Sequence, residues 1–395
     1  MRQLVALALF LVHMSHAHGD EQWSGYIAGE WRGFSQSPSD PAQHGDNSSL
    51  SMQLEYYRDW NNGDDSFVFT PFLRIDGHDK QRSHFDIREL NWTSVHQDWE
   101  ITVGVGKVFW GVTESQHLVD IINQTDLVES TDGEEKLGQP MFRLGLVQDW
   151  GNIDLFILPG FRERTFPSRN ARLRTAIPVD ISEAEYESSR GRNNIDAAIR
   201  WFHTLGDWDI GLSHFSGTSR EPDFRLSTDG SGRPVLIPVY MTIDQTSLDV
   251  QATKGDWLWK LELISRNGQG DRYTAATGGF EYTLYGIFES SADLGLITEY
   301  LYDDRGDAAS SPFEDDLFLG ARLAMNDEAS SELLAGTIID LQNNSRVFSV
   351  EASRRFGDDL KLNLEGRFFS NIDNNDPLTS FRQDDFIQLE LAWYF

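Results

Sequence analysis

The sequence predicts a single transmembrane antiparallel β-barrel of about 18 strands, with 16 as the alternative count. Three observations lead to this all-β fold class. Apolar and polar residues alternate along many short segments, turn-forming residues separate the segments, and short connections alternate with long ones. Successive side chains of a strand point to opposite faces, so each segment has one apolar and one polar face. A barrel that spans a bilayer has this pattern because alternate residues meet lipid and lumen.

The first residues have the features of a cleavable export signal. Arg2 gives a positive start, residues 4–12 are an apolar run, and the small residues Ser15 and Ala17 follow at the positions that a signal peptidase reads. The run is much shorter than the roughly 20 apolar residues that a membrane-spanning helix needs. We therefore expect residues 1–17 to be a signal peptide and residues 18–395 to form the barrel.

Composition limits the partners that this chain can have. Its 395 residues carry a formal net charge of −30 and include no cysteine. Such a charge argues against nucleic-acid binding, and the missing cysteines exclude stabilisation by disulfides. The mean hydropathy of −0.44 still suits a barrel, in which only alternate strand residues touch lipid. We therefore expect no nucleic-acid partner and no cofactor.

Alternating segments recur from about residue 23 to the end of the chain. The alternation is clearest in residues 50–54, 67–75, 99–105, 142–146, 153–157, 195–201, 257–263, 317–325, 360–368 and 387–395. It is weakest in residues 82–93 and 272–285, which we nevertheless count as strands. Pro71 and Pro159 interrupt two segments and predict bulges or defects in the hydrogen-bonded ladder.

Two kinds of connection separate these segments. Short ones contain Gly, Asn or Asp, which tolerate the positive φ of tight hairpins, and stand at 61–64, 96–98, 150–152, 205–207, 254–256, 326–328 and 357–359. Long polar ones stand at 35–49, 111–139, 165–193, 218–235, 303–312 and 370–382. Short turns on one rim and long loops on the other are typical of a transmembrane barrel. A barrel of this size holds a water-filled lumen unless a segment folds into it.

The connection at residues 111–139 is unusually apolar for a barrel loop. Thr113 and Gln116 match a helix capping box, and apolar residues repeat at helical spacing between 118 and 122. Because such a segment avoids bulk water, we predict a part-helical loop that folds into the lumen and narrows it. Packing on the outer rim or against another subunit is the alternative.

Residues at the start of this loop resemble those of a known family. They read Gly106-Lys107, Phe109-Trp110-Gly111 and Ile122-Asn123-Gln124-Thr125-Asp126. This pattern is similar to the signature of the porin-like DUF1302-type family and distantly to that of alginate-export porins, although many members have Pro in place of Gln124. The final Trp393-Tyr394-Phe395 also resembles the last strand of outer-membrane barrel proteins, which commonly ends in Phe. The resemblance implies a channel in the outer membrane of a Gram-negative bacterium. As its partners we expect outer-membrane lipid, lipopolysaccharide and small solutes, with a homo-oligomer as one of the possible states.

Charged residues on the lumen wall and at its mouth are the candidates for selectivity, because charged walls discriminate between solutes. Five arginines stand out in an acidic chain, namely Arg162, Arg164, Arg169, Arg172 and Arg174. Guanidinium groups bind carboxylate or phosphate, so these residues either attract anions or pair with lipopolysaccharide phosphates and nearby glutamates. We expect pore-lining or selectivity roles for Lys107, Glu114, Asp120, Asp126, Arg143, Arg162, Arg164, Arg200 and Arg322.

The predicted function is therefore the passive passage of small hydrophilic solutes, with anions as a candidate class. Polysaccharide export and a structural barrel with a plugged lumen are alternatives. A lipid hydrolase would need His214 and Ser216 to act together, but residues two apart on a strand are too far apart for an easy direct bond. We therefore expect no enzyme and no catalytic residue, and no histidine spacing indicates a metal.

Overall fold

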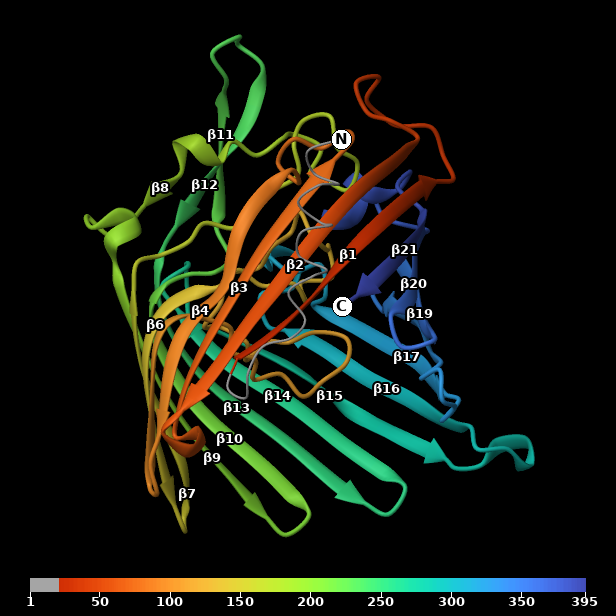
Figure 1. Ribbon diagram of the computed structural model, residues 1–395. Helices are drawn as coiled ribbons and strands as arrows, with labels where there is room; N and C mark the ends of the chain where they lie inside the picture. Colours follow the sequence, from red (N-terminus) through yellow and green to blue (C-terminus); the bar gives the residue numbers. More distant parts are fainter. Residues whose placement is uncertain (1–20) are drawn as a thin grey trace.

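Eighteen strands form one closed antiparallel barrel in the computed structural model, which describes residues 21–395 (Figure 1). Consecutive barrel strands pair with each other, and β21 returns to pair with β1. Such closure leaves no strand edge unpaired, as a barrel in lipid requires. The predicted fold class and the higher strand count are confirmed. The predicted signal peptide, residues 1–17, lies outside the described residues.

The barrel strands are mostly 9 to 15 residues long. They are β1 (Glu21–Phe34), β2 (Asp46–Trp60), β3 (Asp65–Asp76), β4 (His84–Val95), β5 (Trp99–Gly106), β6 (Gln139–Gln148), β7 (Gly151–Pro159), β9 (Ile195–Leu205), β10 (Trp208–Thr218), β13 (Thr242–Lys254), β14 (Trp257–Asn267), β15 (Tyr273–Leu284), β16 (Asp293–Asp303), β17 (Asp315–Ala324), β18 (Glu332–Asp340), β19 (Arg346–Phe356), β20 (Leu360–Ser370) and β21 (Phe386–Tyr394). Single-turn 3-10 helices stand at Asn61–Gly63, Ile181–Glu183, Gly191–Asn193, Ile287–Glu289, Gly306–Ala308 and Pro377–Phe381. No helix among residues 21–395 is long and apolar enough to cross a bilayer.

The two rims differ as predicted. Tight hairpins such as β9–β10 and β13–β14 lie at one end, and the long connections lie at the other (Figure 1). Gly25 and Phe395 exchange two backbone hydrogen bonds of 3.0 Å, so β1 and β21 are joined near the short-turn rim. The two weakest predicted strands form as β4 and β15, and the pairing register shifts between Thr70 and Pro71, where a bulge is predicted.

One loop holds structure that the sequence did not predict. The sequence predicts a long polar connection at residues 218–235, but β11 (Asp223–Thr228) and β12 (Pro234–Tyr240) form a hairpin there. The two-residue β8 (Glu185–Tyr186) pairs in parallel with β12 and completes a small second sheet. Figure 1 shows this hairpin standing above the rim of long loops.

The two faces of the barrel strands carry different side chains, as β14 illustrates. Trp257, Trp259 and Leu261 are exposed on the outside, while the alternate residues Glu262 and Arg266 are buried inside. The ring of Trp257 lies 5.6 Å from that of Trp259 and 4.6 Å from that of Tyr282 on β15. Aromatic clusters near a rim, beside an apolar outer face, are typical of a barrel whose outside meets lipid.

Candidate functional site

The long connection between β5 and β6, residues 107–138, lies inside the barrel; we call it the constriction loop. Its Val119 and Ile122 have no exposed surface, and Trp110 and Ile121 are almost fully buried. They pack against inward-facing apolar residues of the wall, namely Met141, Phe156, Leu158, Ala198, Phe215, Ile243, Ile264, Tyr273 and Ala275. The loop therefore covers the inner wall from β6 to β15, and the predicted inward fold is confirmed.

The predicted helix in this loop is wrong. No helix occurs between Lys107 and Gly138; instead the single hydroxyl hydrogen of Thr113 is shared between two acceptors, the carbonyl of Gln116 and the carboxylate of Glu262. The apolar spacing between 118 and 122 reflects burial in the cluster rather than helical periodicity. Carboxylates of the wall accept the backbone N–H groups of residues 112–115 and of Val119, and no i to i−4 ladder follows them along the loop.

Two inward-facing carboxylates of the wall hold this part of the loop; we call Glu262 on β14 and Glu299 on β16 the carboxylate clasp. Glu262 accepts the backbone N–H groups of residues 112, 113 and 119 at 2.7, 3.0 and 3.1 Å. Glu299 accepts those of residues 114 and 115 at 2.8 Å each, together with the Ser115 hydroxyl at 2.6 Å. Both carboxylates are fully buried. Hydrogen bonds to an ionised acceptor are stronger than neutral ones, so the clasp fixes residues 112–119 against β14 and β16.

His117 extends the clasp toward the lumen. Its Nε2 lies 2.7 Å from Glu134, and its Nδ1 lies 3.7 Å from Glu262. Burial disfavours the charged imidazolium, but hydrogen bonds and charge from Glu134 and Glu262 outweigh it and raise the pKa of His117 to about 10. The same partnership holds the pKa of Glu134 below its usual value, although burial acts in the opposite direction.

The far end of the constriction loop is tied to the opposite wall by buried ion pairs. Arg82, from the β3–β4 loop, contacts both oxygens of Glu30 on β1 at 2.6 and 2.8 Å and the carbonyl of Val128 at 2.8 Å. Arg74 on β3 bridges Glu30 at 3.1 Å and Glu129 of the loop at 2.8 Å. These side chains are almost fully buried, so they fix the loop on both sides of the barrel.

An open cavity of about 770 Å³ remains between the constriction loop and the uncovered wall. That wall consists of β17 to β21 together with β1, and Arg74 of β3 adds to it. The lining extends from Glu332, the first residue of β18, to Leu378 and Phe381 in the β20–β21 loop. Because β18 begins at the short-turn rim and the β20–β21 loop belongs to the other rim, the cavity follows the wall from one rim to the other.

Acids outnumber bases on the cavity lining. Ten carboxylates line it, namely Glu30, Glu114, Glu129, Asp132, Glu134, Glu135, Glu332, Glu351, Glu365 and Glu390. The Lys and Arg side chains are four, namely Arg74, Arg322, Lys361 and Arg367. Arg367 is shared between Asp132 of the loop at 3.2 Å, Glu351 at 2.7 Å and Glu365 at 3.5 Å. The bases are thus divided among several acids, and the lining keeps a negative excess.

Of the nine residues expected at the pore, Glu114 and Arg322 line the cavity. They form an ion pair of 2.5 Å, and Lys260 approaches the same carboxylate at 3.7 Å. Lys107 lies 3.9 Å from Glu135, and burial is the main reason why its pKa falls below the usual value.

The other expected residues lie within the wall or beneath the loop. Asp120 and Asp126 are buried, the former beside Lys136 at 3.1 Å, and burial raises the pKa of both carboxyls above the usual range. The arginines have partners of their own: Arg143 pairs with Asp154 at 2.8 Å, Arg162 with Asp86 at 2.7 Å, Arg200 with Asp249 at 2.8 Å, and Arg164 approaches Gln124 at 3.4 Å.

The rest of the arginine run pairs with acids of neighbouring loops. Arg172 contacts Asp384 at 2.6 Å, Arg174 contacts Asp40 at 3.0 Å, and Arg169 lies 3.6 Å from Asp229. The nearby glutamates that are the alternative partners in the sequence analysis stand at 183, 185 and 187, and they are not among these contacts. The run therefore cross-links the long loops above the barrel.

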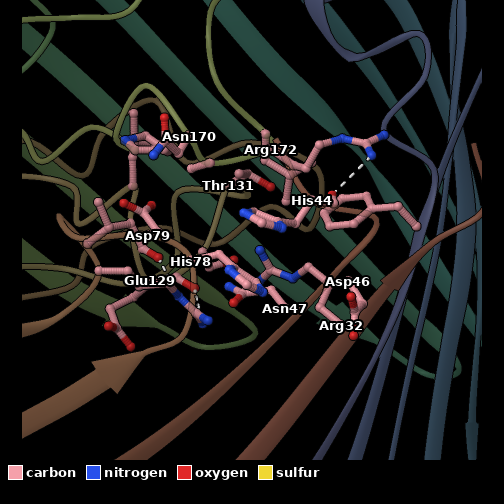
Figure 2. Close-up of a pocket in the computed structure, with 18 residues that line it drawn as sticks. Arg32, His44, Asp46, Asn47, His78, Asp79, Glu129, Thr131, Asn170 and Arg172 are labelled. Carbon is pink, nitrogen blue, oxygen red and sulfur yellow. Dashed lines mark hydrogen bonds between the residues drawn. The ribbon is translucent and has the colours of Figure 1, made fainter. Parts of the chain in front are cut away.

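A second, much smaller cavity of about 30 Å³ lies where these loops meet the constriction loop. Figure 2 shows His44 and His78 side by side within it, with Arg172 on one side and Asp79 on the other. The two rings stack at 3.7 Å between centroids. Such a volume holds about one water molecule, so this cavity is a packing junction between loops.

The hydrolase alternative finds no catalytic geometry. His214 and Ser216 lie on the exposed face of β10, and the histidine contacts Thr246 at 3.0 Å instead of Ser216 or an acid. No cluster of three or more metal-type ligands occurs among residues 21–395.

The residues that matter most at this site were missed from the sequence. Glu262 and Glu299 looked like ordinary polar members of alternating strands, as did Glu351, Glu365 and Glu390. A signal was nevertheless present, because the alternation places each of them on the inner face of its strand. Which inner carboxylates touch the loop and which remain in open water depends on the path of the loop.

Comparisons with known proteins add little to this picture. No protein-family model and no curated protein matches the chain. Membership of the DUF1302-type family or of the alginate-export porins is therefore not established. Among solved structures, a triple mutant of Rhodopseudomonas blastica porin has a TM-score of 0.46 and 10% identity, covering 95% of this chain and 100% of that one. OmpT, an outer membrane protein of Vibrio cholerae with loop L8 deleted, has a TM-score of 0.48 and 10% identity, covering 95% and 99%. Likeness at this level carries no functional conclusion, and function must come from this chain's own residues.

Proposed function

We propose that this protein is a bacterial outer-membrane channel through which small hydrophilic solutes diffuse passively. The cavity of about 770 Å³ that runs between the two rims is the observation that supports this most. A closed barrel with an apolar outer face is stable in lipid because all of its strands are paired, and its polar interior then provides a path for water. The constriction loop narrows that path to the half of the lumen beside β17 to β21.

The lining favours cations over anions. Ten carboxylates face four Lys or Arg side chains and a protonated His117, an excess of five negative charges by count. Arg82, Arg88 and Lys260, behind the lining, offset part of this excess because they pair with Glu30, Glu129, Glu135 and Glu114. Glu332 and Glu390 line the cavity without an ion pair among the described residues, so the preference rests mainly on them. Rings and walls of acidic side chains raise the local concentration of cations. Of the arginines that suggested anions, Arg162 and Arg172 pair with Asp86 and Asp384. Arg164 approaches Gln124 instead of an acid, but it does not line the cavity, so these arginines add little positive charge to the path. Polysaccharide export has no specific contact in its favour.

Planar-bilayer recordings with purified protein test this function. In a KCl gradient we expect steady conductance and a reversal potential displaced toward the potassium equilibrium value. Glu390→Gln should reduce that displacement, because Glu390 lines the cavity and has Asn363 as its hydrogen-bond partner at 3.0 Å.

Glu185→Gln is the matched control, since it removes the same charge from the outer sheet, where Glu185 pairs with Arg225. Neutralising Arg162 and Arg164 should change the reversal potential little. A folded protein that conducts no current refutes the channel, and a preference for chloride refutes the proposed charge selectivity.

A further inference from the structure

The constriction loop meets the barrel wall through an unusual set of contacts. Five backbone N–H groups, from residues 112, 113, 114, 115 and 119, and two hydroxyls end on only two side chains, Glu262 and Glu299. A loop with this backbone path has no helix or sheet ladder to satisfy these donors, so leaving them unpaired in the interior would be costly. The two carboxylates therefore satisfy backbone donors that a helix or a sheet would otherwise satisfy.

The positions of Glu262 and Glu299 allow these side chains to influence the width of the pore. They come from β14 and β16, on the wall away from β5 and β6, between which the loop is inserted. Residues 113, 114 and 115, which they hold, themselves line the cavity. The hold of Glu299 on the N–H of Glu114 also orients that side chain toward Arg322. Loss of the clasp would thus move one wall of the cavity.

We infer that Glu262 and Glu299 are positioning residues that set the size limit of the pore by holding residues 112–119 against the wall. This inference rests on the proposed channel function. It assigns size exclusion to the clasp, and charge selectivity to other residues of the lining. The solutes concerned are the larger hydrophilic ones, which the present cavity excludes.

Replacing either glutamate of the clasp by glutamine tests its role while changing the shape of the side chain very little. In Glu262→Gln and Glu299→Gln, whichever way the amide turns, its NH₂ group replaces one accepting oxygen and faces a backbone N–H. A hydrogen bond to an ionised acceptor shifts an equilibrium by about tenfold or more, so the released state of the loop should become correspondingly more populated. We expect higher single-channel conductance, and faster swelling of proteoliposomes in sugars that the parent protein excludes.

Asp340→Asn is the matched control, because Asp340 is an almost fully buried carboxylate at the end of β18 that accepts the backbone N–H groups of Gln342 and Asn343 and touches neither the constriction loop nor the cavity. It should leave conductance and size limit unchanged. If the wall variants fail to fold, as judged by heat-modifiable electrophoretic mobility, Ser115→Ala removes one contact of Glu299 without altering a barrel strand and should show a smaller effect in the same direction.

The outcomes separate the two proposals. A parent protein without conductance refutes the channel itself. A conducting parent whose folded clasp variants and Ser115→Ala keep the same conductance and the same size limit overturns the role of Glu262 and Glu299. An equal effect of Asp340→Asn also overturns it, because the change would then follow from the loss of any buried carboxylate that accepts backbone N–H groups.

Discussion

The buried ion pairs at the far end of the constriction loop provide a quantitative prediction. In Arg82→Gln, Glu30 loses a two-point contact of 2.6 and 2.8 Å, and the carbonyl of Val128 loses its donor. Breaking a buried ion pair by removing one partner costs about 3–5 kcal/mol. Because Arg74 still contacts Glu30 at 3.1 Å, we expect the lower part of that range. The surrounding carboxylates outweigh desolvation and hold the pKa of Arg82 above its usual value, as a strongly held cation requires.

The matched control is Arg58→Gln, which removes an arginine whose 3.3 Å pair with Glu21 is about half exposed. Exposed pairs contribute about 0–1 kcal/mol. The assay is urea unfolding in lipid vesicles, followed by the fluorescence of the 12 tryptophans. A loss for Arg82→Gln no greater than that for Arg58→Gln would refute the view that this network anchors the loop.

Three further predictions concern the wall and the loop. Leu261→Arg, which puts a charge on the outer face of β14, should lower the free energy of unfolding in lipid by about 2–4 kcal/mol if that position lies near the bilayer midplane, whereas an unchanged value would argue against lipid contact. His117 should stabilise the docked loop fully below its unfolded pKa of 6.5 and lose this effect as pH rises through about 10, so conductance should increase above that pH in the parent and not in His117→Gln. Arg367→Gln should free Asp132, Glu351 and Glu365 and move the reversal potential further toward that of potassium; a shift toward chloride would contradict the assigned lining.

The barrel could be predicted from the sequence because its pattern is local. Alternation in segments such as 257–263 reflects side chains that meet lipid or lumen directly, and tight turns carry their own Gly, Asn and Asp signals. Apolar residues on the inner face, such as Phe215 and Ile264, do not fit that simple pattern. They are apolar because the constriction loop covers them, and the position of the loop is not encoded in the strands alone.

The charged site could be predicted only in part for the same reason. A run of arginines predicts a positive surface when the partners of the arginines are unknown. Here the partners of Arg172 and Arg174 are Asp384 and Asp40, which are far away in the sequence. Helical spacing likewise misled at 118–122, because buried apolar residues in an irregular loop can repeat by chance. Long-range pairing thus decided which charges face the open cavity.

The most direct test of the central claim uses the absence of cysteine from the parent chain. The claim is that successive residues of each strand in the uncovered wall point in turn to a water-filled channel and to the surrounding lipid. Ser349 lines the cavity, and its neighbour Phe348 is exposed on the other face of β19. In planar bilayers, a charged, membrane-impermeant thiol reagent should react with Ser349→Cys and reduce the conductance, and it should have no effect on Phe348→Cys. Equal reactivity at both positions, or reaction at Phe348→Cys alone, would contradict the account.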